Sequence, residues 1–250
     1  MQHKRSGKSP SRREILKALG VFAAGVVLGE NERLAMADEP IRLYAFLPAL
    51  ERTRAIEEAL RRALPAISIT VFGRFADFAA AVAAEKPEGA LSPSDTLRAL
   101  GISPSLLGVA SGSSAEPYVM LTKAPNGSLS ELAGGIVGVV DIVGRSELPR
   151  LVGRMLGLAV QPTVRRVLQI ADLLPLLHLD LAPSVVLPER LSQDFQKMSH
   201  LNLRVLKPGV ALLGRTALGY PTGKANAALE LALRRSPASV RTILGVEGWT

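Results

Sequence analysis

The side chains that most often carry enzymatic chemistry are few in this chain and widely spaced. Cysteine is absent, and the only histidines after residue 37 are His178 and His200, 22 residues apart. Zinc sites built on thiolates are therefore excluded, and a histidine-rich metal site is not expected. The sequence contains no G-x-S-x-G, no H-E-x-x-H and no carboxylate pair in a recognisable motif. We therefore predict no catalytic constellation, no metal and no cofactor.

Serine hydroxyls stand at several points where an apolar run gives way to a helical pattern. Ser92 and Ser94 flank a proline ahead of one expected helix, and Ser146 precedes another at 147–158. A serine at such a position accepts a hydrogen bond from a free backbone N–H of the first helical turn. Helix capping is therefore the simplest interpretation of all three.

The elements that must position these residues alternate between short apolar runs and amphipathic stretches. The run 67–72 alternates and is β-branched, as in strands, whereas 51–64 repeats apolar residues at helical spacing. We expect strands at 41–46, 67–72, 89–91, 106–110, 118–122, 136–141, 163–168, 184–187, 201–206 and 210–218. We expect helices at 51–64, 75–84, 94–100, 147–158, 170–179 and 225–235, and a tail at 240–250. Repeated strand–helix units predict an α/β fold, with helices on both faces of mainly parallel strands.

The first 37 residues have the three parts of a secretory signal. A basic segment ends at Lys17, an uncharged and mostly apolar run covers 18–29, and Ala35-Met36-Ala37 forms a small-x-small cleavage pattern before Asp38. The apolar run has 12 residues, whereas a membrane-spanning helix needs about 20. Ser-Arg-Arg-Glu-Ile-Leu-Lys at 11–17 resembles the twin-arginine export motif. We therefore expect residues 1–37 to be a signal peptide and the mature protein to be soluble in the periplasm.

The charge of the chain is concentrated in this signal. It holds seven of the 30 Lys and Arg residues and three of the 22 Asp and Glu residues, so the remainder carries +4 of the formal +8. No basic block is interleaved with aromatic residues, as single-strand nucleic-acid surfaces require. A nucleic-acid partner is therefore not expected.

Two segments of the mature chain carry a family resemblance. The first is S-L-S-E-L-A-G-G-I-V-G-V-V-D at 128–141, followed by Gly-Arg-Ser at 144–146. The second is A-L-G-Y-P-T-G-K-A-N-A-A-L-E-L-A-L at 217–233, followed by I-L-G-V-E-G-W at 243–249. Together with the strand–helix order, these segments resemble the type 2 periplasmic solute-binding proteins, particularly the phosphonate and sulfonate/nitrate branch.

The resemblance implies a two-lobed α/β architecture with mixed sheets flanked by helices. Residues 38–122 and 215–250 would form the first lobe, and 123–214 the second. A two-strand hinge, near 118–123 and 212–220, would let the lobes close on a ligand. The expected partners are a small molecule and a membrane ABC permease or sensor protein, and the expected state is a monomer.

The resemblance also implies a ligand cleft where strand ends and helix N-termini of both lobes converge. Helix N-termini carry free N–H groups and a partial positive charge, so an anion is the expected ligand. The candidate contacts are Phe46, Leu47, Pro48, Ser92, Ser94, Ser113, Ser114, Asp141, Arg145 and Ser146.

Most of these candidates have a structural explanation as well. Ser113 and Ser114 lie in a segment of ordinary loop composition, Asp141 is also a turn former, and Arg145 is also a solvated surface charge. Three functions remain open. The first is capture of a solute for an ABC importer, the second is a sensor or accessory module that binds a membrane protein, and the third is an enzyme on the same fold. A cleft filled by large side chains would favour the second.

Overall fold

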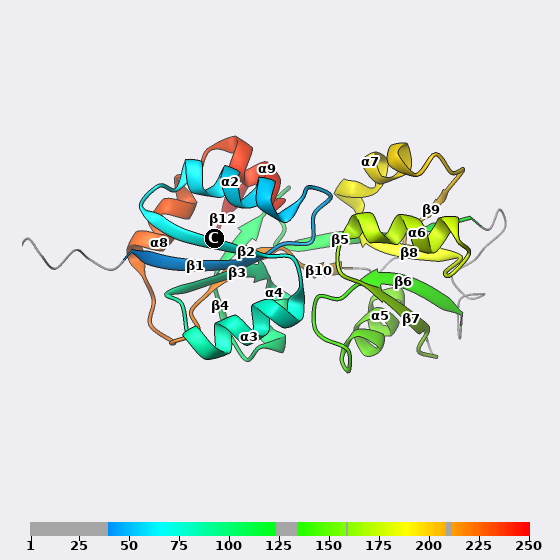
Figure 1. Ribbon diagram of the computed structural model, residues 1–250, viewed down its shortest axis with the longest axis horizontal. Coiled ribbons are helices and arrows are strands. Elements are labelled where there is room, and N and C mark those ends of the chain that lie inside the picture. The colour runs from blue at the N-terminus through cyan, green and yellow to red at the C-terminus, as the bar shows by residue number, and fades with distance from the viewer. Residues whose placement is uncertain (1–39, 124–134, 159, 209–211) are drawn as a thin grey trace, which may run out of the picture. The chain divides into compact units, whose positions relative to one another are not determined.

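The structure of the protein is a computed structural model that describes residues 40–123, 135–158, 160–208 and 212–250 (Figure 1). The expected signal peptide at 1–37 lies outside these residues, as do 128–134 of the first resembling segment. Residues 41–250 form one unit. No helix within the described ranges has the length and apolar character needed to cross a membrane.

The first sheet has six strands in the order β12-β4-β11-β3-β1-β2. Their bounds are β1 Ile41–Phe46, β2 Ile67–Phe72, β3 Gly89–Pro93, β4 Pro104–Val109, β11 Thr216–Gly219 and β12 Gly248–Trp249. Strand β1 is parallel to β2 and β3, whereas β11 is antiparallel to β3 and β4. Alternate side chains of β1 enter two different hydrophobic clusters, because successive residues of a strand point to opposite faces.

Helices cover both faces of this sheet (Figure 1). They are α2 Thr53–Ala63, α3 Phe75–Glu85, α4 Ser94–Ala99, α8 Ala227–Arg234 and α9 Ala238–Leu244. Buried residues of α2, α8 and α9 share one cluster with Leu43 and Ala45, and those of α3 and α4 share the other with Tyr44 and Phe46. The apolar spacing of α2 explains its orientation, since Ile56 and Leu60, one turn apart, are its buried residues.

The second sheet runs β10-β5-β8-β6-β7, and β9 also pairs with β5. Its strands are β5 Ala115–Thr122, β6 Ile136–Val140, β7 Thr163–Val167, β8 Ser184–Pro188, β9 Arg204–Leu206 and β10 Leu212–Gly214. Its helices are α5 Leu148–Leu156, the 3-10 helix η2 Ile170–Asp172, α6 Leu173–His178 and α7 Glu189–Ser199. Strand β6 is parallel to β7 and β8, and β5 is antiparallel to β8. These two mixed sheets with flanking helices confirm the predicted fold class. The expectation of mainly parallel strands is wrong, because β5 and the strands from β9 onward pair antiparallel with their neighbours.

Two chain segments connect the sheets. Strand β5 follows β4 of the first sheet and belongs to the second, and β10 and β11 make the return across Arg215. Strands β5 and β10 pair antiparallel, with Gly214 opposite Ala115. This is the two-strand hinge that was expected. The assignment of whole segments to lobes, with boundaries at 122/123 and 214/215, stays a prediction.

The structure differs from the expected elements at the C-terminal end and near the hinge. The single strand expected at 210–218 is two strands in different sheets, because the chain changes sheet at Arg215. The expected tail at 240–250 contains most of α9, which buries Val240 and Leu244, and then strand β12 beside β4. Helix α9 has only seven residues and ends at Gly245, which takes a left-handed φ of 69°. Its apolar periodicity is therefore too short to predict a helix from the sequence.

Candidate functional site

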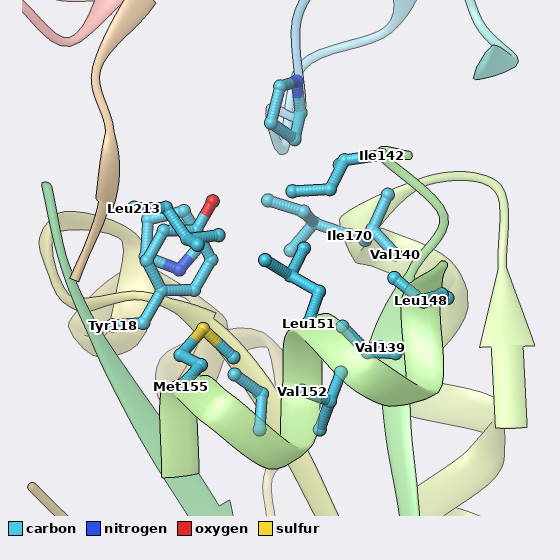
Figure 2. A pocket seen from close by; sticks show the side chains of 13 residues that line it. Tyr118, Val139, Val140, Ile142, Leu148, Leu151, Val152, Met155, Ile170 and Leu213 are labelled. Carbon is cyan, nitrogen blue, oxygen red and sulfur yellow. The ribbon is translucent and has the colours of Figure 1, made fainter. Parts of the chain in front are cut away.

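A pocket lies where the segment after β1 meets the second sheet and both hinge strands (Figure 2). Thirteen residues line it, and all but one have wholly apolar side chains. They are Pro48, Tyr118, Val139, Val140, Ile142, Leu148, Leu151, Val152, Met155, Ile170, Val186, Pro188 and Leu213. The free volume is about 10 Å³, roughly the space of one water molecule. The pocket is therefore filled by its own side chains.

Tyr118 supplies the only polar side-chain atom of this lining. The residue is 7% exposed, and within the described part of the chain its hydroxyl has no hydrogen-bond partner. Figure 2 shows this oxygen pointing into the pocket beside Leu213. Burial raises the pKa of the Tyr118 phenol, because a phenolate would lose its hydration there. The group therefore remains a neutral O–H.

Helix α5 forms one wall of the pocket. It contributes Leu148, Leu151, Val152 and Met155, which lie on one side because residues three and four apart face the same direction. An open hollow of about 240 Å³ lies beside this wall. The hollow and the pocket have Leu151, Met155 and Leu213 in common. The hollow is the exposed side of the same junction.

The candidates after β1 have different roles. Pro48 lines the pocket. Phe46 is 2% exposed and packs against the rings of Phe75 and Phe78, with ring centres 6.2 and 5.9 Å away. Leu47 belongs to the hydrophobic cluster on the other face of the first sheet. Phe46, Leu47 and Pro48 also line a second crevice of about 10 Å³. Of all the predicted contacts, only Pro48 lines the pocket of Figure 2.

Ser92 and Ser94 are buried and hydrogen-bonded within the first sheet and its helix. The Ser92 hydroxyl donates to the Phe46 carbonyl at 2.9 Å, and the Ser94 hydroxyl accepts from Nη1 of Arg98 at 3.1 Å. Neither makes a side-chain cap: the residue at the N-cap of α4 is Pro93. The Ser92 hydroxyl joins β3 to β1 and the Ser94 hydroxyl bonds within α4, so the capping interpretation is wrong for them.

Ser113 and Ser114 are exposed in the loop before β5. Both offer backbone carbonyls to Arg215 of the return segment: Nε of Arg215 donates to Ser113 at 3.1 Å, and its backbone N–H donates to Ser114 at 2.8 Å. The Ser113 hydroxyl accepts from the Ala115 N–H at 3.1 Å. These serines therefore fix the start of the hinge, and neither lines the pocket.

Asp141, Arg145 and Ser146 follow β6. Asp141 accepts from the Gly144 N–H at 2.7 Å and from Nη1 of Arg166 at 2.8 Å, so its carboxylate closes the turn and anchors β7. Arg145 and Ser146 are exposed. Ser146 was expected to cap a helix from 147, but α5 begins at Leu148 with Glu147 at the N-cap and no side-chain cap bond. The turn from Gly144 already adopts helical bonding, since the Leu148 N–H donates to the Gly144 carbonyl at 3.1 Å.

The sequence singled out none of the pocket residues except Pro48, and it missed Tyr118, Ile142 and the α5 wall among them. Their apolar character predicted core, and most of them do contribute to a hydrophobic cluster that spans both sheets. The available signal was the spacing of Leu148, Leu151, Val152 and Met155, which gives α5 a continuous apolar face. Nothing in the sequence distinguished that face from an ordinary core face.

Two charged side chains meet a buried carboxylate at the hinge. Nε of Arg190 in α7 lies 2.5 Å from Oε1 of Glu116 in β5, and Nη1 of Arg215 lies 3.8 Å from the same oxygen. Nη1 of Arg215 also donates to the Gly245 carbonyl at 3.0 Å. The network joins α7 of the second sheet to the hinge and to α9 of the first. Within the described ranges, no group of three or more His, Cys, Asp or Glu residues could hold a metal ion.

No protein-family model matches the sequence, and no curated protein matches it. Solved structures do match its fold. XAC2383 from Xanthomonas citri bound to ATP aligns with a TM-score of 0.57 and 14% identity, over 84% of this chain and 90% of that one. The BvgS periplasmic VFT2 domain of Bordetella pertussis aligns with a TM-score of 0.54 and 16% identity, over 86% and 97%. The substrate-binding protein of an amino acid ABC transporter gives 0.53 and 11%, over 82% and 92%.

The chain has the two-lobed fold of type 2 periplasmic binding proteins. At these identities the likeness concerns the fold, and the phosphonate or sulfonate/nitrate branch stays a prediction. In a two-lobed binding protein, the place for a ligand is the junction of the lobes beside the hinge. The pocket of Figure 2 occupies that place, since its lining comes from the β1 segment, the second sheet and both hinge strands.

Proposed function

We propose that this protein is an exported solute-binding protein that captures a small molecule between its two lobes and presents the closed form to a membrane partner. The observation that carries the proposal is the pocket beside the hinge, which combines Pro48 of the first lobe with Tyr118 and Leu213 of the hinge strands. A pocket built from both lobes changes when the lobes move, so ligand binding there is coupled to closure.

Binding suits this pocket better than catalysis. General acid–base chemistry needs a group that gains and loses a proton near the working pH. Tyr118 is the only ionisable side chain of the lining, and burial raises its pKa further above that range. The lining therefore provides a shaped apolar surface and one hydroxyl, which are means of recognition.

The expected anion has no cationic partner in this lining, which contains no Lys, Arg or His. The proposal therefore does not depend on an anionic ligand. The membrane partner that we propose first is an ABC permease, the partner implied by the family resemblance. Proteins with this fold include both a substrate-binding protein of an amino acid ABC transporter and the BvgS periplasmic domain.

A second function, a sensor or accessory module that binds a membrane protein, has its own support. The pocket is filled to about 10 Å³, and large apolar side chains are exposed around the second sheet. Leu179 is 68% exposed and Val160 is 57% exposed. These exposed side chains are candidate contacts for a protein partner.

A thermal-shift screen tests the first function. The protein is melted with phosphonates, phosphate, sulfonates, nitrate, amino acids and neutral ring compounds. A ligand at a hundredfold above its Kd should stabilise the folded state by about 2.7 kcal/mol. Small-angle X-ray scattering with the same compound should show a changed radius of gyration, because a ligand enters the filled pocket only when the lobes move. A selective stabilisation supports solute capture, whereas a flat screen with no scattering change would favour the protein-partner function.

A further inference from the structure

The pocket of Figure 2 has an unusual lining for a site that would take an amino acid or an inorganic anion. Its twelve other side chains are aliphatic, prolyl or thioether groups, and its one polar atom is the Tyr118 hydroxyl. Moving an ionised carboxylate or ammonium group into such surroundings without a partner is strongly unfavourable. The lining therefore selects against ligands whose charge would enter it.

The Tyr118 hydroxyl is a hydrogen-bonding group held ready in this apolar space. The residue is 7% exposed, its hydroxyl has no partner among the described residues, and the oxygen points into the pocket (Figure 2). The hydroxyl is therefore free to hydrogen-bond a ligand atom that faces it. A phenol that stays protonated can donate to a carbonyl, ether or hydroxyl oxygen.

The adjoining hollow does not supply the missing charge. It is lined by one acid and one base, Asp95 and Arg154. The Asp95 carboxylate is already used: its Oδ2 accepts from the Gly214 N–H at 2.6 Å, and its Oδ1 lies 3.7 Å from Nη1 of Arg98. The remaining charge of the hollow is Arg154, which does not line the pocket itself.

We propose that the ligand of this pocket is an uncharged, mainly apolar small molecule with one oxygen that accepts or shares a hydrogen bond from Tyr118. This inference rests on the proposed function, because the present free volume admits a ligand only when the two lobes separate. The α5 wall and Val139 would contact the apolar body of the ligand, and the lobe that carries Pro48 would close over it. Each added methylene that is buried should tighten binding roughly fourfold.

The test uses one six-carbon ring with different substituents, titrated into the protein by ligand-observed NMR. Cyclohexanone and cyclohexanol are the neutral probes with an oxygen, and methylenecyclohexane is the ketone's isostere without one. Cyclohexanecarboxylate, cyclohexylphosphonate and cyclohexylammonium carry charge. We expect the two oxygenated neutral probes to bind at least tenfold more tightly than any charged one.

Two tyrosine variants locate the hydrogen bond. Tyr118→Phe should weaken cyclohexanone binding about two- to tenfold and leave methylenecyclohexane unchanged. Tyr220→Phe is the matched control, because its hydroxyl also lies in the protein but donates to Glu230 at 2.8 Å, away from the pocket lining. It should leave both affinities unchanged.

Three outcomes would overturn the proposed ligand class: charged probes that bind as tightly as cyclohexanone, no binding of any neutral probe, or no effect of Tyr118→Phe on the ketone. In the first case solute binding itself still stands, with a different ligand chemistry. If, in addition, neither the charged rings nor the compounds of the thermal-shift screen bind, the proposed solute-binding function also fails.

Discussion

Nε of Arg190 in α7 donates a hydrogen bond of 2.5 Å to Oε1 of Glu116 in β5. Because Arg215 approaches the same oxygen, this largely buried carboxylate lies between two guanidinium groups at the hinge. Glu116 is 7% exposed. A buried carboxylate is retained only with partners that replace its hydration. The second guanidinium, that of Arg215, also holds the Gly245 carbonyl, so the contact joins elements of both lobes.

Glu116→Gln should destabilise the protein, because it leaves two arginines without their shared counter-charge. The free energy of unfolding should fall by roughly 2–4 kcal/mol in urea titrations. The control is Glu58→Gln, which removes the exposed ion pair with Arg54 and should cost less than about 1 kcal/mol. Equal losses in the two variants would show that the hinge network contributes no more than a surface pair.

Gly144→Ala should destabilise the contact between the two lobes. Gly144 has a φ of 91°, and a Cβ there would lie 3.1 Å from Cε1 of Phe75 in the other lobe. Gly223→Ala is a matched control: its φ is 71°, but its Cβ would meet nothing within 4 Å. Both substitutions should cost about 1–2 kcal/mol for the backbone, but Gly144→Ala should cost more in urea titrations, because Phe75 must give way to the new methyl group.

The contact with Phe75 can be tested separately from backbone strain. Adding Phe75→Leu to Gly144→Ala should cost less free energy of unfolding than the sum of the two single changes, because the smaller side chain leaves room for the new methyl group. If the two losses simply add, contact with Phe75 does not explain the extra loss in Gly144→Ala.

Ser92→Ala should act on stability and leave ligand binding in the folded protein unchanged. The Ser92 hydroxyl is fully buried and donates to the Phe46 carbonyl, and a buried acceptor that loses its donor costs about 1–3 kcal/mol. Ser113→Ala, at an exposed position, should change stability by no more than about 0.5 kcal/mol. A large loss of ligand affinity in Ser92→Ala at unchanged stability would instead restore Ser92 as a contact of the ligand.

The order of strands and helices was largely predictable from the sequence, whereas the site was not. Strands such as 67–72 are buried on one face or on both, so their apolar pattern identifies them without knowledge of their neighbours. The prediction of the site placed ligand contacts in the polar loops after strands. In the structure, Ser92 and Asp141 are used to bond those loops to the fold.

Tyr118 shows why the pocket escaped sequence analysis. It lies within β5, a strand whose apolar sequence predicts a place in the hydrophobic core. Its hydroxyl faces the pocket only because β10 and α5 meet beside it. Those neighbours are about 95 and 33 residues away along the chain. A contact of that kind depends on how the strands cross between the lobes, which local periodicity does not report.

The three tyrosines should titrate at higher pH in the folded protein than in the unfolded one. The pKa of Tyr44 is raised by its hydrogen bond to Glu85, that of Tyr118 by burial, and that of Tyr220 to about 12 by burial and its hydrogen bond to Glu230. The ordinary value is 10.0. Between pH 10 and 12 the folded state should therefore hold protons that the unfolded state has lost.

Stability should consequently be complete below pH 10 and decrease as pH rises above it. The buried phenol of Tyr118 should contribute a loss of up to about 1.4 kcal/mol per pH unit. Phenolate absorbance should rise near pH 10 in urea but later, and together with unfolding, in native buffer. Native absorbance that rises near pH 10 would contradict the prediction, and Tyr118→Phe should reduce the slope of stability against pH.

Export should depend on the arginine pair at 12 and 13. The motif at 11–17 is predicted from sequence alone, and such signals act as addresses read by a receptor. Arg12→Lys with Arg13→Lys keeps the charge of the segment, so a receptor that recognises the guanidinium pair should reject it, and the precursor should accumulate in the cytoplasm.

Arg5→Lys, a conservative change outside the motif, should leave export unchanged. Fractionation of cells followed by N-terminal sequencing measures both the compartment and the cleavage site, which we expect between Ala37 and Asp38. Unchanged export of the double lysine variant would show that the segment is read as a general secretory signal, with charge alone sufficient.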